Sequence, residues 1–217
     1  RRELDFVTDI AHRIPAQVTF WLLDIPEDRW DRLAHCEHNM VSSSDPEFTE
    51  GRTPGEAAAA AAMEVSMYFA ELIQARMADL RDDREDILSV FLRARDTDDP
   101  MSWVQIVAEA GLLLAGGLDT TRAAASAGGM LPLLQHPELL ATLQADPGLL
   151  PTAIEEFVRY ASPITSETRT ATMDWHVGGQ QVKEGDRVVV WGAACNRDPD
   201  VFDAPDRYDI TRNPNRH

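Results

Sequence analysis

The sequence predicts a mainly helical protein with a small β region near its end. Apolar residues recur at helical spacing through most of the chain before Pro163, and they are densest from Ile106 to Leu114. Short β-branched runs and the glycine pair Gly178-Gly179 appear only after Pro163. We therefore expect one domain, helical over about 1–162 and formed of a β-hairpin and irregular chain over about 163–217.

Composition restricts the classes of partner. The chain has 217 residues, enough for one substantial domain, and a formal net charge of -17. This charge argues against nucleic acid and against an anionic membrane surface as partners. No apolar run is long enough for a transmembrane helix, and no signal peptide precedes Phe6. Cys36 and Cys195 make no disulfide framework, so we expect a cytoplasmic protein.

Prolines and capping residues predict where the helices begin. Prolines at 15, 26, 54 and 137 each stand near the start of an apolar run with helical spacing. Ser102 with Gln105 forms a capping-box pattern before a helix that we expect to run to about Leu134, and Thr152 with Glu155 repeats it. The expected loops are 42–46, continued through 51–55, and 96–100; the expected hairpin is 170–182, with a strand over 188–191.

Two glycines interrupt the longest apolar helix. Gly116 and Gly117 each cost about 1 kcal/mol relative to alanine in a helix interior. In a structural interpretation, the glycines let another segment approach closely, and Thr120 bonds back to the carbonyl of Gly116. In a functional interpretation, they leave a shelf for a flat ligand, and Asp119 is a proton-relay candidate because a carboxylate in an apolar helix needs a partner.

Two further features allow a structural or a functional interpretation. Glu156 and Arg159 share a helix face, and such an i,i+3 pair is ordinarily a surface ion pair. Arg169 suits a ligand carboxylate because its guanidinium offers two parallel donors, or it pairs with Glu167 or Asp174 across strands.

Leu112 to Thr121 (LLLAGGLDTT) closely resembles the oxygen-activation segment of the cytochrome P450 family. Ala153 to Tyr160 resembles the family helix that carries a Glu-x-x-Arg pair, at the family's distance from the first motif. The chain around Arg169 and the stretches at 174–185, 194–198, 202–205 and 209–217 follow the same family pattern. The resemblance covers nearly the whole chain, and residues 42–51 are similar to soluble bacterial members.

The resemblance implies the cytochrome P450 fold, haem b and a haem-thiolate monooxygenase activity. In the family, the threonine matching Thr120 holds water and dioxygen, and the acid matching Asp119 helps to deliver protons for O–O cleavage. The resemblance further implies an electron donor of the ferredoxin or ferredoxin reductase type and an apolar small-molecule substrate. The implied residues are Asp119 and Thr120 for catalysis; Gly116, Gly117, Thr120 and Arg169 for cofactor binding; Leu112, Ala115, Gly116 and Thr165 for substrate binding; and Glu156 and Arg159 for structure.

The family's iron ligand is a cysteine in a loop that would begin after His217. We therefore expect a central fragment, without the family's N-terminal part, that does not form a haem-thiolate centre as it stands. Cys195 is expected to be a packed small residue, and the helix around Cys36 either has a solvated face or shares a metal between His35 and His38. The alternative functions are a non-catalytic P450-like scaffold and a helical small-molecule-binding domain.

Overall fold

The computed structural model describes residues 3–42, 49, 51–81, 83–96 and 100–217, and it divides the chain into two compact units. The first unit covers Arg1–Arg122 and the second covers Ala123–His217, so the boundary lies inside the helix expected over 102–134. Most of the loop expected at 42–46 and most of the loop at 96–100 lie outside the described residues. We describe each unit by itself.

The first unit is helical. Its elements are the π-helix Val7–Ala11, α1 (Arg13–Leu22), the 3-10 turn Glu27–Arg29, α2 (Trp30–Val41), α3 (Pro54–Ala78), α4 (Ile87–Arg93), the 3-10 turn Ala94–Asp96, α5 (Trp103–Gly117) and the beginning of α6 (Asp119–Ala123). Its core lies where α5 meets α1 and α3, and one stripe of α5, Ile106, Ala110 and Leu114, is fully buried there. The i,i+4 spacing of this stripe explains why α5 forms at this place.

The second unit begins with helices and ends in short strands and irregular chain. Its elements are the π-helix Ala124–Met130, α7 (Leu131–Gln135), α8 (Pro137–Ala145), the 3-10 turn Pro147–Leu149, α9 (Leu150–Ala161), β1 (Glu167–Thr170), β2 (Trp175–Val177), β3 (Gln180–Val182), β4 (Arg187–Val190) and α10 (Gly192–Cys195). Leu133, Leu143, Ala153, Tyr208 and Ile210 form its core. The mainly helical class with a small β region is therefore confirmed.

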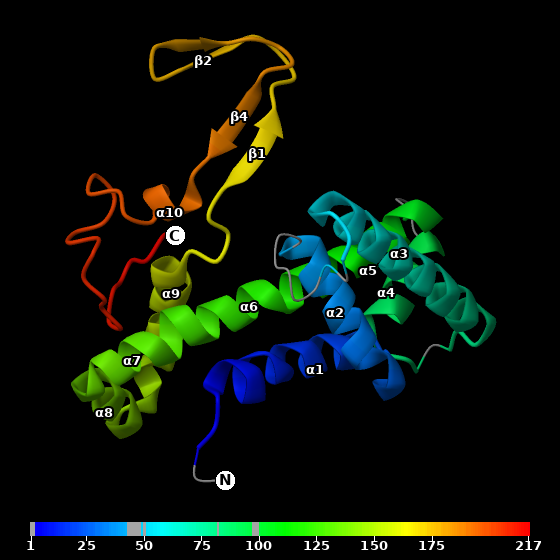
Figure 1. Cartoon of the computed structure of the whole chain (residues 1–217), viewed down its shortest axis with the longest axis horizontal. Coiled ribbons are helices and arrows are strands. Elements are labelled where there is room, and N and C mark those ends of the chain that lie inside the picture. The colour runs from blue at the N-terminus through cyan, green and yellow to red at the C-terminus, as the bar shows by residue number, and fades with distance from the viewer. Residues whose placement is uncertain (1–2, 43–48, 50, 82, 97–99) are drawn as a thin grey trace. The chain divides into compact units, whose positions relative to one another are not determined.

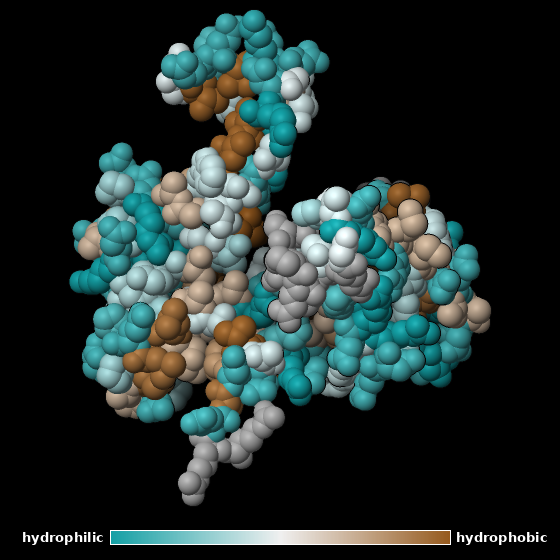
Figure 2. Space-filling model, viewed as in Figure 1, coloured by the Kyte–Doolittle hydropathy of each residue, from teal (hydrophilic) through white to brown (hydrophobic). Residues whose placement is uncertain are grey.

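The strands form two antiparallel pairs, β1 with β4 and β2 with β3. Figure 1 shows β1 and β4 side by side, with the β2 hairpin beyond them. The expected hairpin turn is confirmed at Gly178-Gly179, where both residues have positive φ angles, +55° and +79°, that glycine adopts without strain. Hydrophobic residues lie exposed along β4, and Figure 2 shows brown residues in this region.

Three local predictions hold and two are wrong. Ser102 caps α5 through the expected box with Gln105, and α8 begins at Pro137. The expected box at Thr152 is wrong, because α9 begins earlier, at Leu150, and the Thr152 hydroxyl donates to the carbonyl of Leu149. The helix start expected at Pro54 also holds, because α3 begins there, and the loop expected over 51–55 therefore ends at Thr53. Cys195 is exposed and is not a packed core residue.

The long helix expected over 102–134 is interrupted. The backbone of Leu118 leaves the helical region, with φ -102° and ψ -82°, and a π-helix occupies Ala124–Met130. Gly128 explains the second irregularity, because a Cβ there would lie 2.0 Å from the carbonyl oxygen of Phe157 on α9. The π-helix therefore accompanies a close approach of this segment to α9, which the spacing of apolar residues in the sequence does not predict.

Candidate functional site

The two glycines of the interrupted helix have different surroundings. A Cβ at Gly117 would lie 2.2 Å from Oγ1 of Thr19 on α1, so this glycine permits a close approach of two helices. A Cβ at Gly116 would meet nothing within 4 Å among the described residues. The structural interpretation therefore accounts for Gly117, whereas Gly116 leaves bare backbone on an open face of α5. A cofactor contact at Gly117 stays a prediction.

The open face of α5 is apolar. Leu112 is 64% exposed, and Leu113 is also exposed, although both are large hydrophobic residues. Leu112 and Ala115 also border a groove of about 540 Å³ between α3 and α5, whose wall includes Val65, Trp103 and Val107. Exposed apolar surface next to bare backbone is the surface expected where an apolar ligand binds.

Thr120 stands just after the break in the helix. Its hydroxyl donates a hydrogen bond to the carbonyl of Gly116, with an O–O distance of 2.8 Å. This is the bond that the sequence suggested, and threonine bonds of this kind bend helices. Because the hydroxyl proton is used in this bond, the Thr120 oxygen can act only as an acceptor toward a further group.

Asp119 is buried, with 7% of its surface exposed, and it has charged partners within the first unit. Its Oδ2 lies 3.3 Å from Nδ1 of His38 on α2, and its Oδ1 lies 3.0 Å from Nη2 of Arg122, one turn further along. A carboxylate in an apolar helix is costly unless it is paired, so the sequence predicts a partner for Asp119. The structure supplies two.

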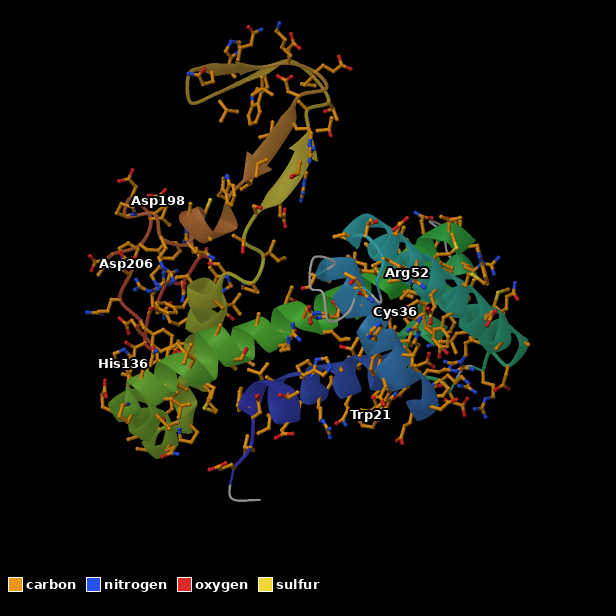
Figure 3. All side chains as sticks on the ribbon, viewed as in Figure 1. Trp21, Cys36, Arg52, His136, Asp198 and Asp206 are labelled. Atoms are coloured by element: carbon orange, nitrogen blue, oxygen red, sulfur yellow. The ribbon has the colours of Figure 1, made fainter. Side chains whose placement is uncertain are left out.

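The solvated face expected around Cys36 is wrong. Cys36, Glu37, His38 and Asn39 of α2 are all buried, and Figure 3 marks Cys36 on this helix. No group of three or more possible metal ligands exists among the described residues. The burial of Glu37 and His38 was not predicted from the sequence, although the spacing of apolar residues on this helix indicates it. The apolar positions Trp30, Leu33 and Ala34 place Glu37 on the same helix face, seven residues after Trp30.

Glu156 and Arg159 form a fully buried ion pair at the centre of the second unit, each with 0% of its surface exposed. Nε and Nη2 of Arg159 donate to the two carboxylate oxygens of Glu156, at 2.7 and 2.8 Å. Burial opposes the ionisation of Glu156. Hydrogen bonds from Arg159 and from the backbone N–H of Asp209 outweigh burial and keep the Glu156 pKa below its ordinary value.

The same pair organises the irregular chain that follows α10. Arg159 donates to three backbone carbonyl oxygens there, those of Asn196 at 2.7 Å, Pro205 at 2.8 Å and Arg207 at 3.3 Å. Glu156 accepts hydrogen bonds from the Asp209 backbone, the Arg212 guanidinium and the Asn215 amide. The guanidinium fork can serve several carbonyls at once, which an ammonium cannot do with the same geometry.

Arg169 and Thr165 lie in the second unit, near its strands. Arg169 is on β1, its side chain is 68% exposed, and its Nη2 lies 2.6 Å from Oε2 of Glu167 on the same strand. Thr165 is exposed just before β1, and its carbonyl accepts a hydrogen bond from Ala193. An exposed guanidinium paired only at the surface can exchange its partner at little cost. The ligand roles predicted for Arg169 and Thr165 stay predictions.

Comparison with known proteins identifies the family. The family profile for Cytochrome P450 matches residues 52–147 and 148–216. The Mycobacterium tuberculosis protein named cytochrome P450 126 is 40% identical over 98% of this chain, and linalool 8-monooxygenase of Pseudomonas putida is 34% identical over 99%. A solved Mycobacterium marinum cytochrome P450 in complex with pseudoionone has a TM-score of 0.87 and 33% identity, covering 99% of this chain and 51% of that one.

The chain therefore belongs to the cytochrome P450 family, and its fold is that of cytochrome P450 structures. It covers 51% of each of the two curated relatives named above, so it spans about half of their length. Within the described residues, no helix combines the length and the apolar character needed to cross a membrane.

Members of this family use haem. The first unit fits such a group, because the bare backbone at Gly116 and the exposed side chain of Leu112 form an open apolar face that a flat macrocycle can cover. In the second unit, the exposed guanidinium of Arg169 suits a propionate.

Proposed function

We propose that the protein containing this chain is a haem-thiolate monooxygenase that activates dioxygen to hydroxylate an apolar small molecule. The observation that carries this proposal is the buried Asp119 directly before Thr120, at a break in the helix and beside the open face at Gly116. A proton-carrying group next to an ordered hydroxyl serves a reaction that consumes protons at a water-poor site. Neither the scaffold nor the binding domain requires this pair.

Haem with a thiolate ligand supplies the oxygen-activating chemistry when it is bound. The chain's own residues have three tasks. The Thr120 hydroxyl donates to the Gly116 carbonyl and so accepts a hydrogen bond from a water molecule, which fixes the water's orientation. The Asp119 carboxyl, bounded by His38 and Arg122, passes protons toward that water. Arg169, which pairs with Glu167 at the surface, would hold a haem propionate.

The proposed substrate is an apolar small molecule, of the size of a terpenoid, a steroid or a polyketide. Leu112, Ala115, Gly116 and Thr165 are the proposed substrate-binding residues. The groove that Leu112 and Ala115 border is apolar, which favours such a ligand. The names of relatives agree with this class, since one is a linalool 8-monooxygenase and another is a 6-deoxyerythronolide B hydroxylase.

We further propose that the electrons come from a ferredoxin or a ferredoxin reductase and that the protein works in the cytoplasm. Glu156 and Arg159 are proposed to brace the region that carries the haem-ligand cysteine, because they already fix the backbone from Asn196 to Asn215.

Carbon monoxide tests the proposal. The reduced protein that includes the haem-ligand loop is expected to give the Soret band typical of a thiolate ligand, and Cys36→Ser and Cys195→Ser should leave this band unchanged. Residues 1–217 alone should give no such band. A full-length protein that binds no haem contradicts the proposal and favours the scaffold. A band that depends on Cys36 or Cys195 contradicts the assignment of the ligand.

A further inference from the structure

A buried ionisable cluster surrounds Asp119 on the side of α2. Glu37 is only 1% exposed, and the backbone N–H of Asp119 acts on its carboxylate to lower the Glu37 pKa, against the larger effects of burial and of the Asp119 charge. His38, the next residue, contacts the Asp119 carboxylate, and so does Arg122. Two carboxyl groups from distant parts of the sequence are therefore held in one buried site.

Glu37 is incompletely satisfied in this site. Its Oε1 is buried and has no hydrogen-bond partner in the part of the chain that the structure describes. A buried carboxylate oxygen without a donor is costly, whereas the protonated carboxylic acid is not charged and costs less. Burial first, and then the negative charge of Asp119, raise the pKa of Glu37 to about 8.

A cleft leads from the surface toward this cluster. It has a volume of about 310 Å³, and His12, His35, His38 and Arg122 line it. His12 comes from the turn before α1, and its own pKa is lowered by burial and by the charge of Arg122. His38 and Arg122 thus have one side toward the cleft and another toward Asp119. Imidazoles can pass protons on at neutral pH.

We propose that Glu37 stores the proton that Asp119 delivers, and that the cleft lined by His12, His35 and His38 returns a proton from solvent to Glu37. This inference rests on the proposed function, because delivery is useful only to a proton-consuming reaction. Glu37 is a positioning residue that acts through Asp119.

Each proton that leaves Glu37 is accounted for along the proposed path. The proton leaves an Oε of Glu37 and joins a carboxylate oxygen of Asp119, so Glu37 becomes an anion and Asp119 becomes neutral. Asp119 then releases the proton toward the water at Thr120 and is a carboxylate again. Glu37 regains a proton from solvent, and the net result is one proton delivered. Asp119 and Arg122 are the charged groups that face Glu37, and the charge of Arg122 stabilises its anion between the two steps.

Infrared spectroscopy of the haem-loaded full-length protein tests the proposal. The protonated Glu37 is expected to give a carbonyl band of a neutral carboxylic acid that disappears as the pH rises through about 8. Glu37→Gln should remove the band. The control Glu71→Gln replaces an exposed carboxylate on α3 by the same amide, and this variant should retain the carbonyl band. Asp119→Asn should shift the midpoint of the titration to lower pH, because it removes the neighbouring negative charge.

A band that survives Glu37→Gln, or a midpoint that Asp119→Asn leaves in place, overturns the proposal. If Glu37→Gln does not fold, the midpoint in Asp119→Asn decides alone. In the active protein, product formation by the wild type is expected to depend on pH near 8, and Glu37→Gln should remove this dependence. Loss of the thiolate-type carbon monoxide band in the wild type contradicts the monooxygenase function instead, and the infrared result still decides whether Glu37 holds a proton.

Discussion

Gly117 lies so close to Thr19 that a Cβ at residue 117 would come within 2.2 Å of the threonine Oγ1. Its neighbour Gly116 has no such restriction. The two glycines are adjacent in sequence, yet one permits α5 to pack on α1 and the other leaves bare backbone on a neighbouring face of α5. A substitution to alanine therefore separates packing from ligand binding.

We expect Gly117→Ala to lower the free energy of unfolding by about 1–3 kcal/mol, the usual cost of an overpacked core. Gly116→Ala is expected to raise it by about 0.5–1 kcal/mol, because alanine is the better helix former and meets no neighbour. Urea unfolding measures both. Equal effects of the two substitutions would contradict the assignment of the two faces. Haem affinity should fall in Gly116→Ala, since its methyl group covers the bare backbone.

Glu156→Gln is expected to destabilise the second unit by about 3–5 kcal/mol, because Arg159 then stays buried without a counter-charge. Glu167→Gln is the matched control. It removes the same kind of partner from the exposed Arg169 and should change stability by about 1 kcal/mol or less. Chemical unfolding followed by the fluorescence of the protein checks the difference between the two variants. A similar cost for both would mean that the buried pair contributes no more than a surface pair.

Stability should depend on pH through Glu37. The pKa of Glu37 is about 8 in the folded protein, whereas a glutamate in an unfolded chain has a pKa of about 4.3. Between these values the folded protein holds a proton that the unfolded chain has released, so the free energy of unfolding falls as the pH rises. The contribution of Glu37 to the free energy of unfolding is complete below its pKa in the unfolded chain. It is lost above its pKa in the folded protein.

Glu37→Gln should flatten this part of the pH dependence. Unfolding midpoints in urea at several pH values from 5 to 8 provide the measurement. The stability of the variant relative to the wild type should increase as the pH approaches 8. An unchanged slope in the variant would refute the assignment of the proton to Glu37.

Thr120→Ala is expected to uncouple oxygen consumption from product formation, because it removes the hydroxyl that orients water beside Asp119. The matched control is Thr142→Ala on α8, where the hydroxyl donates to the carbonyl of Glu138 at the same distance of 2.8 Å. The ratio of product formed to dioxygen consumed is the measurement. Equal ratios in wild type and Thr120→Ala would remove Thr120 from the proposed mechanism.

Local patterns account for the parts of the fold that the sequence predicts. The capping box of Ser102 and Gln105 and the turn at Gly178-Gly179 need only neighbours in the chain, and both are present as expected. The break at Leu118 and the π-helix at Ala124–Met130 accompany long-range approaches, of Thr19 and of Phe157, that no local pattern contains.

The candidate site divides in the same way. Asp119 and Thr120 stand out because a polar pair interrupts an apolar helix, and the bond of Thr120 to Gly116 follows from their spacing. Glu37 and His38 do not stand out, since charged residues on a helix are ordinarily solvated. Their burial comes from contact with a helix distant in sequence, and only the apolar stripe that begins at Trp30 hints at it.

The chain from Asn196 onward contains no helix or strand, and the side chains of Glu156 and Arg159 supply bonds that a backbone ladder would otherwise supply. Such a segment has little resistance to local opening of its own. Its amide hydrogens should therefore exchange with solvent together, at a rate set by the opening of one ion pair on α9. Two side chains thus make a long irregular stretch behave as a single cooperative unit with the helix.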